Sequence, residues 1–170
     1  MTTMEEKESA ARRMVTKYMW LSMGAGLVPV PVWDLVLLTG IQLKMAKDLA
    51  DHYAIPFAKN RVKLIVSTLI GSVAPGAFAY GPIGSLLKVI PGVGQFAGMV
   101  GLPIFAGAST YAVGKVFIQH FESGGTLLDF EPAKMRAHFK QEFEAGKTLA
   151  AQMKNRSPEK PEAEANAAKA

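Results

Sequence analysis

Three side chains that could bind a metal or move a proton lie close together in the sequence. Asp51 and His52 follow Asp48 by three and four residues, a spacing that places all three on one face of a helix. Two carboxylates and an imidazole so arranged could share a metal ion. Two further ligands are not apparent in the sequence. The alternative is the polar face and last turn of an amphipathic helix, where a His also suits the helix dipole.

A second pair of polar residues flanks the most apolar part of the chain. Asp34 follows Pro31 and is expected to cap or open a helix. Gln42 lies about two turns further on, on roughly the same face. These two residues are therefore candidates to line a polar site, and in a membrane such groups are functional by default.

The residue types of the chain exclude several kinds of catalyst. There is no Cys, and the three His are far apart, which removes thiol chemistry and Cys-based metal centres. No nucleophile has an obvious base, and no glycine pattern matches a nucleotide-binding loop. We therefore expect no enzyme activity and no cofactor.

The charge balance points to an acidic partner. The 170-residue chain has a net charge of +5, and 49% of its residues are hydrophobic. A basic excess favours anionic lipid, nucleic acid or an acidic protein. Because most charges lie outside the apolar middle of the chain, we expect a lipid bilayer and no nucleic acid.

The middle of the chain contains two long stretches without charge. No charged residue occurs from Leu64 to Leu87 or from Val89 to Gly114, and Lys88 separates the two stretches. A helix of about 20 residues crosses the hydrocarbon core of a bilayer. These stretches predict a membrane-inserted helical hairpin, broken by Gly and Pro, with its turn near residues 84–94. The alternative is the buried core of a soluble protein.

The basic residues around this hairpin predict its orientation. Lys59, Arg61 and Lys63 precede it and Lys115 follows it, whereas Lys88 alone lies at the turn. Under the positive-inside rule, both termini are then cytoplasmic.

Six Pro and Gly residues are expected to form turns and helix-packing contacts. Each proline forces the residue before it into an extended conformation. A GxxxG pair lets two helices approach closely in lipid, and ordinary turn chemistry after a proline is the alternative for these glycines. The six residues are Pro29, Pro31, Pro91, Gly92, Gly94 and Gly98.

The flanking segments have helical periodicity. Helices are predicted over about residues 3–24 and 32–53, with a third that opens at Lys59. An amphipathic helix is predicted over 131–154, where Pro132 marks the start.

The helical segments predict one domain followed by a tail. Residues 155–170 are polar and lack periodicity, so a disordered tail is predicted. The rest of the chain, residues 1–154, is expected to be a single all-α domain of about five helices.

Two motifs resemble a known family. The first comprises 26–31 with Asp34, 42–45 and a helix that ends at 51–53; the second comprises 89–94, 109–114 and 121–122. In this order they resemble the YcjF-like domain of unknown function, a bacterial membrane-associated helical module often fused to, or encoded beside, Era-like small GTPases. The resemblance spans about residues 10–122. We expect no GTPase module before the domain, so the resemblance implies a GTPase partner in trans and not GTP hydrolysis.

Together, these observations predict a bacterial inner-membrane protein without enzyme activity. It would act as an anchor or scaffold, with the bilayer, a small GTPase in trans and further copies of itself as partners. The first alternative is a pore or transporter component, because broken helices also build conduction paths. The second is a soluble helical module that binds an apolar ligand.

Overall fold

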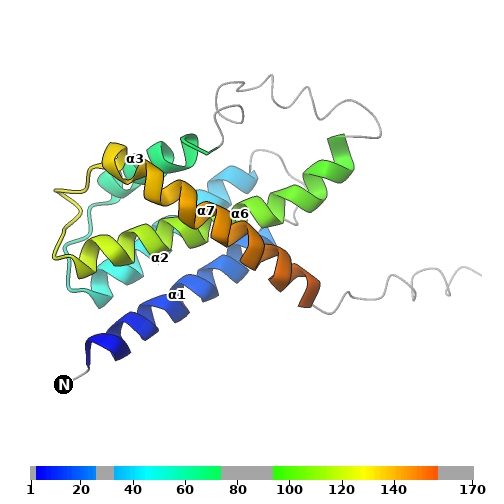
Figure 1. The fold of residues 1–170 in the computed structure, drawn as a ribbon. Coiled ribbons are helices and arrows are strands. Elements are labelled where there is room, and N and C mark those ends of the chain that lie inside the picture. The colour runs from blue at the N-terminus through cyan, green and yellow to red at the C-terminus, as the bar shows by residue number, and fades with distance from the viewer. Residues whose placement is uncertain (1–2, 26–32, 74–93, 157–170) are drawn as a thin grey trace, which may run out of the picture.

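The protein forms a bundle of α-helices. The computed structural model describes residues 3–25, 33–73 and 94–156, with the backbone alone at 33–35 and 94–100. The described residues contain five helices and no strand (Figure 1). The predicted all-α fold of about five helices is therefore confirmed. The helices are α1 (Met4–Ala25), α2 (Trp33–His52), α3 (Lys59–Gly71), α6 (Gly94–Glu122) and α7 (Pro132–Arg156).

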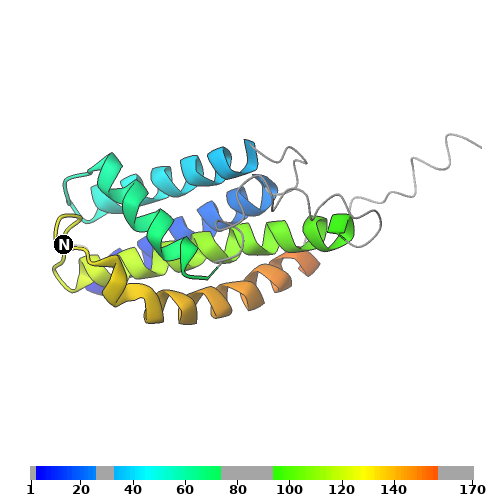
Figure 2. The same cartoon turned by 90° about the horizontal axis from the view of Figure 1, so that it is seen from above.

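Helix α6 is the centre of the bundle. It packs most extensively against α7 and α1 and also contacts α2, so it lies between α7 on one side and the α1–α2 pair on the other (Figure 2). Its side chains Ala112, Val113, Val116 and Phe117 are fully buried. Because a helix buried on all sides must be apolar on all sides, this position explains why α6 carries so little charge.

The described parts of the expected hairpin face protein. Helix α3 packs mainly against α7 and α2 and makes few contacts with α6. Its residues Ile65 and Leu69 are fully buried, as are Ala108 and Val113 of α6. The protein core, rather than lipid, therefore surrounds these side chains. Of the turn predicted near residues 84–94, all but Gly94 lies outside the described residues.

One segment of the described chain could cross a membrane by length and composition. It is Gly101–Glu122 in α6, and 67% of its most apolar window is buried inside the protein. The core helix of a soluble protein meets the same criterion. This helix alone is thus weak support for membrane insertion.

Local sequence signals fix several helix ends. At the start of α1, Thr3 and Glu6 form a capping box: each backbone N–H donates to the other side chain, at 2.9 Å for Thr3 N and 3.3 Å for Glu6 N. After α6, Gly124 has φ +82°, a left-handed conformation that glycine adopts without a Cβ clash. Pro132 opens α7, where its missing N–H costs nothing.

The last helix packs its apolar stripe on the protein's own core. Phe139, Phe143 and Ala150 of α7 are buried. The helix ends at Arg156 instead of the predicted residue 154, because Asn155 and Arg156 still belong to it. The rest of the predicted tail lies outside the described residues.

Candidate functional site

Four helices are charged in one half and uncharged in the other. The last charged residue of α1 is Lys17 and that of α3 is Lys63, whereas the charges of α6 begin at Lys115 and those of α2, apart from Asp34, at Lys44. The carboxyl ends of α1 and α3 and the amino ends of α2 and α6 lie towards the same end of the bundle, where α6 projects beyond the other three helices (Figure 1). The uncharged halves therefore meet at one end of the bundle. We call this the uncharged end, formed by residues 18–25, 33–43, 64–73 and 94–114, and the opposite end the charged end.

Helix α7 does not share this division. It runs from the charged end towards the uncharged end (Figure 1), and Lys147, Lys154 and Arg156 in its second half are charged. Its outer face is therefore suited to water along its whole length.

Contacts between α1 and α2 place their boundary lysines at one level. The Tyr18 hydroxyl donates a hydrogen bond to Asp48, and the same carboxylate pairs with Lys44. Burial raises the pKa of Asp48, but the hydrogen bonds from Lys44 and Tyr18 outweigh it and bring the pKa below its ordinary value. Lys17, next to Tyr18 in the chain, thus lies near Lys44.

Lys115 of α6 and Lys63 of α3 lie at the same height along the bundle axis as Lys17 and Lys44. Gly114 of α6 lies against Val15 of α1, which places Lys115 close to the end of the charged half of α1. Lys63 and Leu43 line a common groove between α3 and α2. A lysine therefore marks the boundary between the two ends on each of these four helices.

The surface of the uncharged end exposes large apolar side chains. Trp20 and Leu21 on α1 are 43% and 49% exposed, and Val36 and Leu37 on α2 are 59% and 45% exposed. Leu64, directly after the boundary on α3, is 56% exposed. Of the seven large apolar side chains exposed among the described residues, these five belong to the uncharged end, whereas Met4 and Leu128 belong to the charged end. Apolar exposure concentrated in one part of a protein is typical of a surface that contacts another apolar phase.

The interior of the uncharged end holds a cluster of polar side chains. Gln42 Nε2 donates to Ser109 Oγ at 3.4 Å and to Thr110 Oγ1 at 3.3 Å. The Ser109 hydroxyl in turn donates to the Ala106 carbonyl at 3.1 Å. All three polar side chains are buried. The candidate Gln42 is thus a link between α2 and α6.

The same cluster extends to α1. Ser22 Oγ donates to the Tyr18 carbonyl at 2.9 Å and lies 2.7 Å from Thr110 Oγ1. Because the Ser22 proton is already used, the Thr110 hydroxyl must donate to Ser22. Both hydroxyls that face Gln42 can then only accept, which fixes the amide orientation. Gln42 Oε1 remains buried without a partner.

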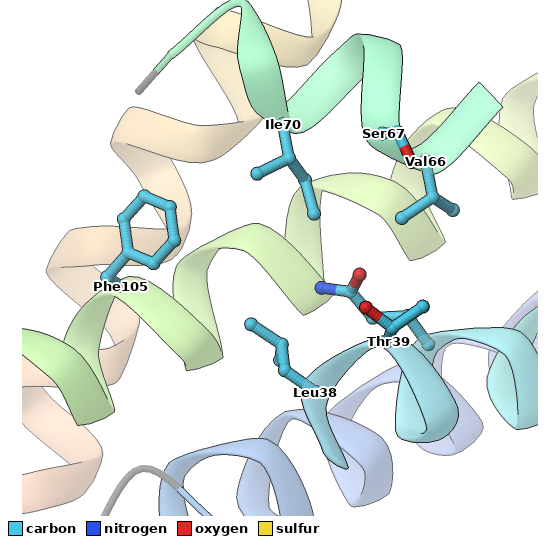
Figure 3. A pocket seen from close by; sticks show the side chains of 7 residues that line it. Leu38, Thr39, Val66, Ser67, Ile70 and Phe105 are labelled. Atoms are coloured by element: carbon cyan, nitrogen blue, oxygen red, sulfur yellow. The ribbon is translucent and has the colours of Figure 1, made fainter. Parts of the chain in front are cut away.

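A small cavity lies beside Gln42. It has a volume of about 80 Å³ and lies between α2, α3 and α6, where Leu38, Ile70 and Phe105 turn towards one another (Figure 3). The space can hold ordered water, which needs only about 10–15 Å³ of such volume. A donor in this cavity would satisfy Gln42 Oε1. The lining residues are Leu38, Thr39, Gln42, Val66, Ser67, Ile70 and Phe105.

The structure does not bring the predicted metal ligands to a common centre. Asp48 bonds to Tyr18 and Lys44, Asp51 pairs with Lys47, and His52 Nε2 lies 2.9 Å from a backbone carbonyl. Within the described ranges, no group of three or more His, Cys, Asp or Glu could hold a metal ion. Asp34 belongs to the first turn of α2, where only the backbone is described.

The predicted turn motif falls mostly outside the described residues. This applies to Pro29, Pro31, Pro91 and Gly92. Gly94 and Gly98 belong to the first turns of α6, where only the backbone is described.

Close helix packing occurs at glycines that the sequence reasoning missed. A Cβ at Gly107 would lie 2.7 Å from Met23 Cγ, and one at Gly114 would lie 2.4 Å from Val15 Cγ2. Gly146 of α7 approaches the backbone of α6. Gly107 and Gly114 are seven residues apart, which places them on one helix face. That spacing was the signal that could have identified them.

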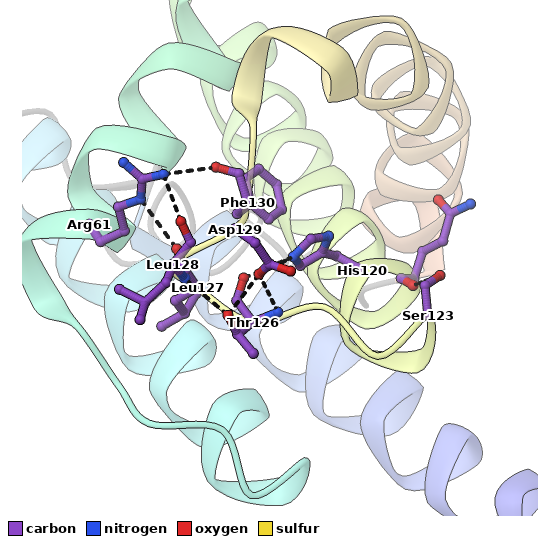
Figure 4. A network of polar contacts seen from close by, with 9 residues as sticks. Arg61, His120, Ser123, Thr126, Leu127, Leu128, Asp129 and Phe130 are labelled. Atoms are coloured by element: carbon purple, nitrogen blue, oxygen red, sulfur yellow. Dashed lines mark hydrogen bonds and ion pairs between the residues drawn. The ribbon is translucent and has the colours of Figure 1, made fainter.

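Arg61 organises the charged end. Its guanidinium donates to the carbonyl oxygens of Leu127 and Leu128, both at 3.2 Å, and of Phe130 at 3.1 Å (Figure 4). It thereby holds the connection between α6 and α7 against α3. Of the basic cluster Lys59, Arg61 and Lys63, the arginine is thus turned to protein.

Comparisons with known proteins match most of the chain. The family model described as "Domain of unknown function (DUF697)" matches residues 1–148. Magnetosome membrane protein 22 of Magnetospirillum gryphiswaldense is 39% identical over 150 residues, which are 88% of this chain and 77% of that protein. No solved structure matches this chain.

Proposed function

The chain belongs to the family described as domain of unknown function (DUF697), and on that premise we propose that it is a non-enzymatic, membrane-associated scaffold that contacts the bilayer through its uncharged end. The observation that carries this proposal is the division of charge along the bundle axis. A charged side chain at the centre of a bilayer costs about 2.5–3.5 kcal/mol or more. Apolar surface removed from water gains about 25 cal/mol per Å².

The boundary lysines fit the level of lipid phosphates. A lysine near the membrane surface keeps its ammonium in the polar layer while its aliphatic stem lies along apolar surface. Lys17, Lys44, Lys63 and Lys115 lie directly beside the uncharged halves. Trp20, exposed on α1, has the amphipathic ring that is enriched at membrane interfaces.

The relative supports this proposal. Magnetosome membrane protein 22 is by its name a membrane protein. Its similarity extends over 88% of this chain and thus includes α2, α3 and α6 of the uncharged end. A membrane-associated role for this chain is consistent with both observations.

Finer features of the proposal concern place and partner. We place both termini on the cytoplasmic side of a bacterial inner membrane, an orientation that the lysine-rich boundary favours under the positive-inside rule. The charged end would then face the cytoplasm. The resemblance to YcjF-like domains suggests a small Era-like GTPase, acting in trans, as the partner at that end.

A matched pair of substitutions tests the contact with lipid. Leu37 at the uncharged end and Leu128 at the charged end are both exposed. We expect Leu37→Lys to weaken flotation of the full chain with phospholipid vesicles at least tenfold, because the new charge would have to stay out of the hydrocarbon. Leu128→Lys, the same change at the other end, should leave flotation unchanged.

Two results would overturn the proposal. The first is equal flotation of both variants and the wild type. The second is a wild-type chain that remains a monodisperse monomer without detergent and does not float with vesicles. That second result would favour the soluble helical module instead.

A further inference from the structure

An open groove runs between α2 and α3 on the outside of the bundle. Its volume is about 410 Å³, within the range of about 300–1,000 Å³ that is usual for ligand sites. Apolar side chains of α2 form one wall and two lysines of α3 form the other. The lining residues are Val36, Thr39, Gly40, Leu43, Lys59 and Lys63.

The two lysines have no acidic partner among the residues that the structure describes. They are one helical turn apart on α3 and both are exposed. On the neighbouring helix, by contrast, Lys44 and Lys47 each form an ion pair with a carboxylate. Arg61, between the two lysines in sequence, is bound to backbone carbonyls at the charged end. The groove thus presents two uncompensated positive charges.

The groove, like the bundle, is charged towards one end and apolar towards the other. Helix α2 runs from the uncharged end towards the charged end, so Val36 lies deeper in the uncharged end than Leu43. The distance along the helix between these residues is about 10 Å at ~1.5 Å per residue. Lys63 therefore lies at the boundary level and Lys59 one turn towards the charged end, and an apolar path leads from Lys63 into the uncharged end. A bilayer phospholipid has the same order of a charged headgroup followed by an acyl chain.

We propose that this groove binds one anionic phospholipid, with its phosphate on Lys59 and Lys63 and an acyl chain along Val36, Gly40 and Leu43. The proposal rests on the proposed membrane contact of the uncharged end and adds a lipid class to it. Charge complementarity selects an anionic headgroup, because the described residues that line the groove include two lysines and no carboxylate. The apolar floor of the groove favours a lipid over a free anion, because only a lipid has an acyl chain that can cover this floor.

Vesicle flotation of the full chain tests the headgroup contact. We compare vesicles of phosphatidylcholine with vesicles that also contain phosphatidylglycerol. A basic residue near an anionic surface contributes about 1 kcal/mol, so Lys59→Gln with Lys63→Gln should weaken binding to the anionic vesicles roughly 30-fold. Binding to neutral vesicles should not change. The control is Arg136→Gln with Lys140→Gln, which removes the same charge at the same spacing from exposed positions on α7.

A second variant tests the acyl-chain contact. A Cβ at Gly40 would meet no atom within 4 Å, and Gly40 is exposed on the groove floor, so we expect Gly40→Leu to fold and to fill that floor. It should reduce the preference for anionic vesicles about as much as the lysine variant does. Inorganic phosphate at matched ionic strength should not compete.

The outcomes separate this inference from the proposed function. If the wild type floats equally with both vesicles, or if the lysine variant behaves like its control, the lipid site is refuted while membrane association stands. Competition by inorganic phosphate would show a simple anion site and also refute it. A change of oligomeric state in the lysine variant, with unchanged flotation, would assign the groove to a second copy of the chain. Failure of the wild type to float with any vesicle would refute the proposed function itself.

Discussion

The two ends of this bundle are held together by different chemistry. At the charged end, ion pairs such as Lys47–Asp51 lie within single helices, and hydrogen bonds to charged groups join separate segments: Arg61 binds the connection between α6 and α7, and the Tyr53 hydroxyl donates to Glu122. Helices approach closely at Gly107 in the uncharged end and at Gly114 on its boundary, and one chain of hydroxyl and amide groups links α1, α2 and α6 in the uncharged end. Charged and uncharged residues thus occupy opposite halves of these helices, in addition to the usual separation of buried and exposed faces.

Each kind of contact suits a different solvent. Exposed ion pairs, such as that of Lys47 with Asp51, contribute less than about 1 kcal/mol and depend on water to solvate both partners. The cluster around Thr110 satisfies its hydroxyl groups internally, as polar groups next to hydrocarbon must. The hydroxyl groups of the uncharged end can therefore be desolvated at little cost, whereas the ion pairs of the charged end cannot.

Substitution of Gly114 in α6 tests the close packing of helices at the boundary of the uncharged end, and we expect it to cause the largest loss of stability. In Gly114→Ala the new Cβ would lie 2.4 Å from Val15 Cγ2 and 3.2 Å from Val15 Cβ, so rotation of the valine cannot clear it. We expect a loss of about 2 kcal/mol in the free energy of unfolding, as for other overpacked cores. Urea unfolding followed by circular dichroism measures this loss.

The control for this substitution is Gly101→Ala. At Gly101 an added Cβ meets no atom within 4 Å, and alanine favours a helix over glycine by about 0.5–1 kcal/mol. The two variants should therefore shift stability in opposite directions. Equal stability of both would contradict close α1–α6 packing at Gly114.

The helices could be predicted from the sequence because their signals are local. Thr3 and Glu6 form a capping box, Pro132 opens a helix and Gly124 follows one, all within a few residues of the chain. The uncharged stretch from 89 to 114 likewise predicted an apolar helix where the structure has α6. Whether protein or lipid surrounds such a helix depends on its neighbours, which no local pattern specifies.

The contacts between distant segments could not be predicted in the same way. The cluster of Ser22, Gln42 and Thr110 draws on three helices, and each residue alone is an ordinary polar position. Arg61 was grouped with its neighbouring lysines because charge alone does not show which side chain turns inwards. Charged and uncharged segments alternate along the sequence. Only the antiparallel packing of the helices brings the uncharged segments together at one end of the bundle.

Replacement of Arg61 tests the charged end, with a somewhat smaller expected effect. Arg61→Met removes donors from three backbone carbonyls but keeps much of the aliphatic stem. Hydrogen bonds from charged groups contribute about 1.5–3 kcal/mol each when buried, and these are partly exposed, so we expect a total loss of about 1.5 kcal/mol in urea unfolding. Arg61→Lys should recover only part of it, since an ammonium lacks the planar fork. Full recovery by lysine would show that charge alone holds the connection.

Acid titration gives the smallest effect and separates the two ends. At the charged end, Asp129 Oδ1 accepts hydrogen bonds from Thr126 Oγ1 and Thr126 N, at 2.7 and 2.6 Å, and these bonds lower the pKa of Asp129 to about 2. Because the folded pKa lies below the unfolded value of about 3.9, the carboxylate stabilises the fold above pH ~4. That stabilisation is lost as the pH falls through the folded pKa.

The substitution Asp129→Asn should therefore be less stable than the wild type at pH 6, and the difference should vanish near pH 2. Urea unfolding at each pH measures it. Both tryptophans of the chain, Trp20 and Trp33, belong to the uncharged end, so their emission reports on that end alone. Both proteins carry Asp34→Asn in this experiment, because Asp34, next to Trp33 in the chain, is the one acid in the sequence of the segments that form the uncharged end. Without urea, their emission should then stay constant from pH 6 to pH 3. A tryptophan shift that follows the titration of Asp129 would show that the two ends respond as one unit, and the division of the bundle into an acid-sensitive and an acid-insensitive end would then be wrong.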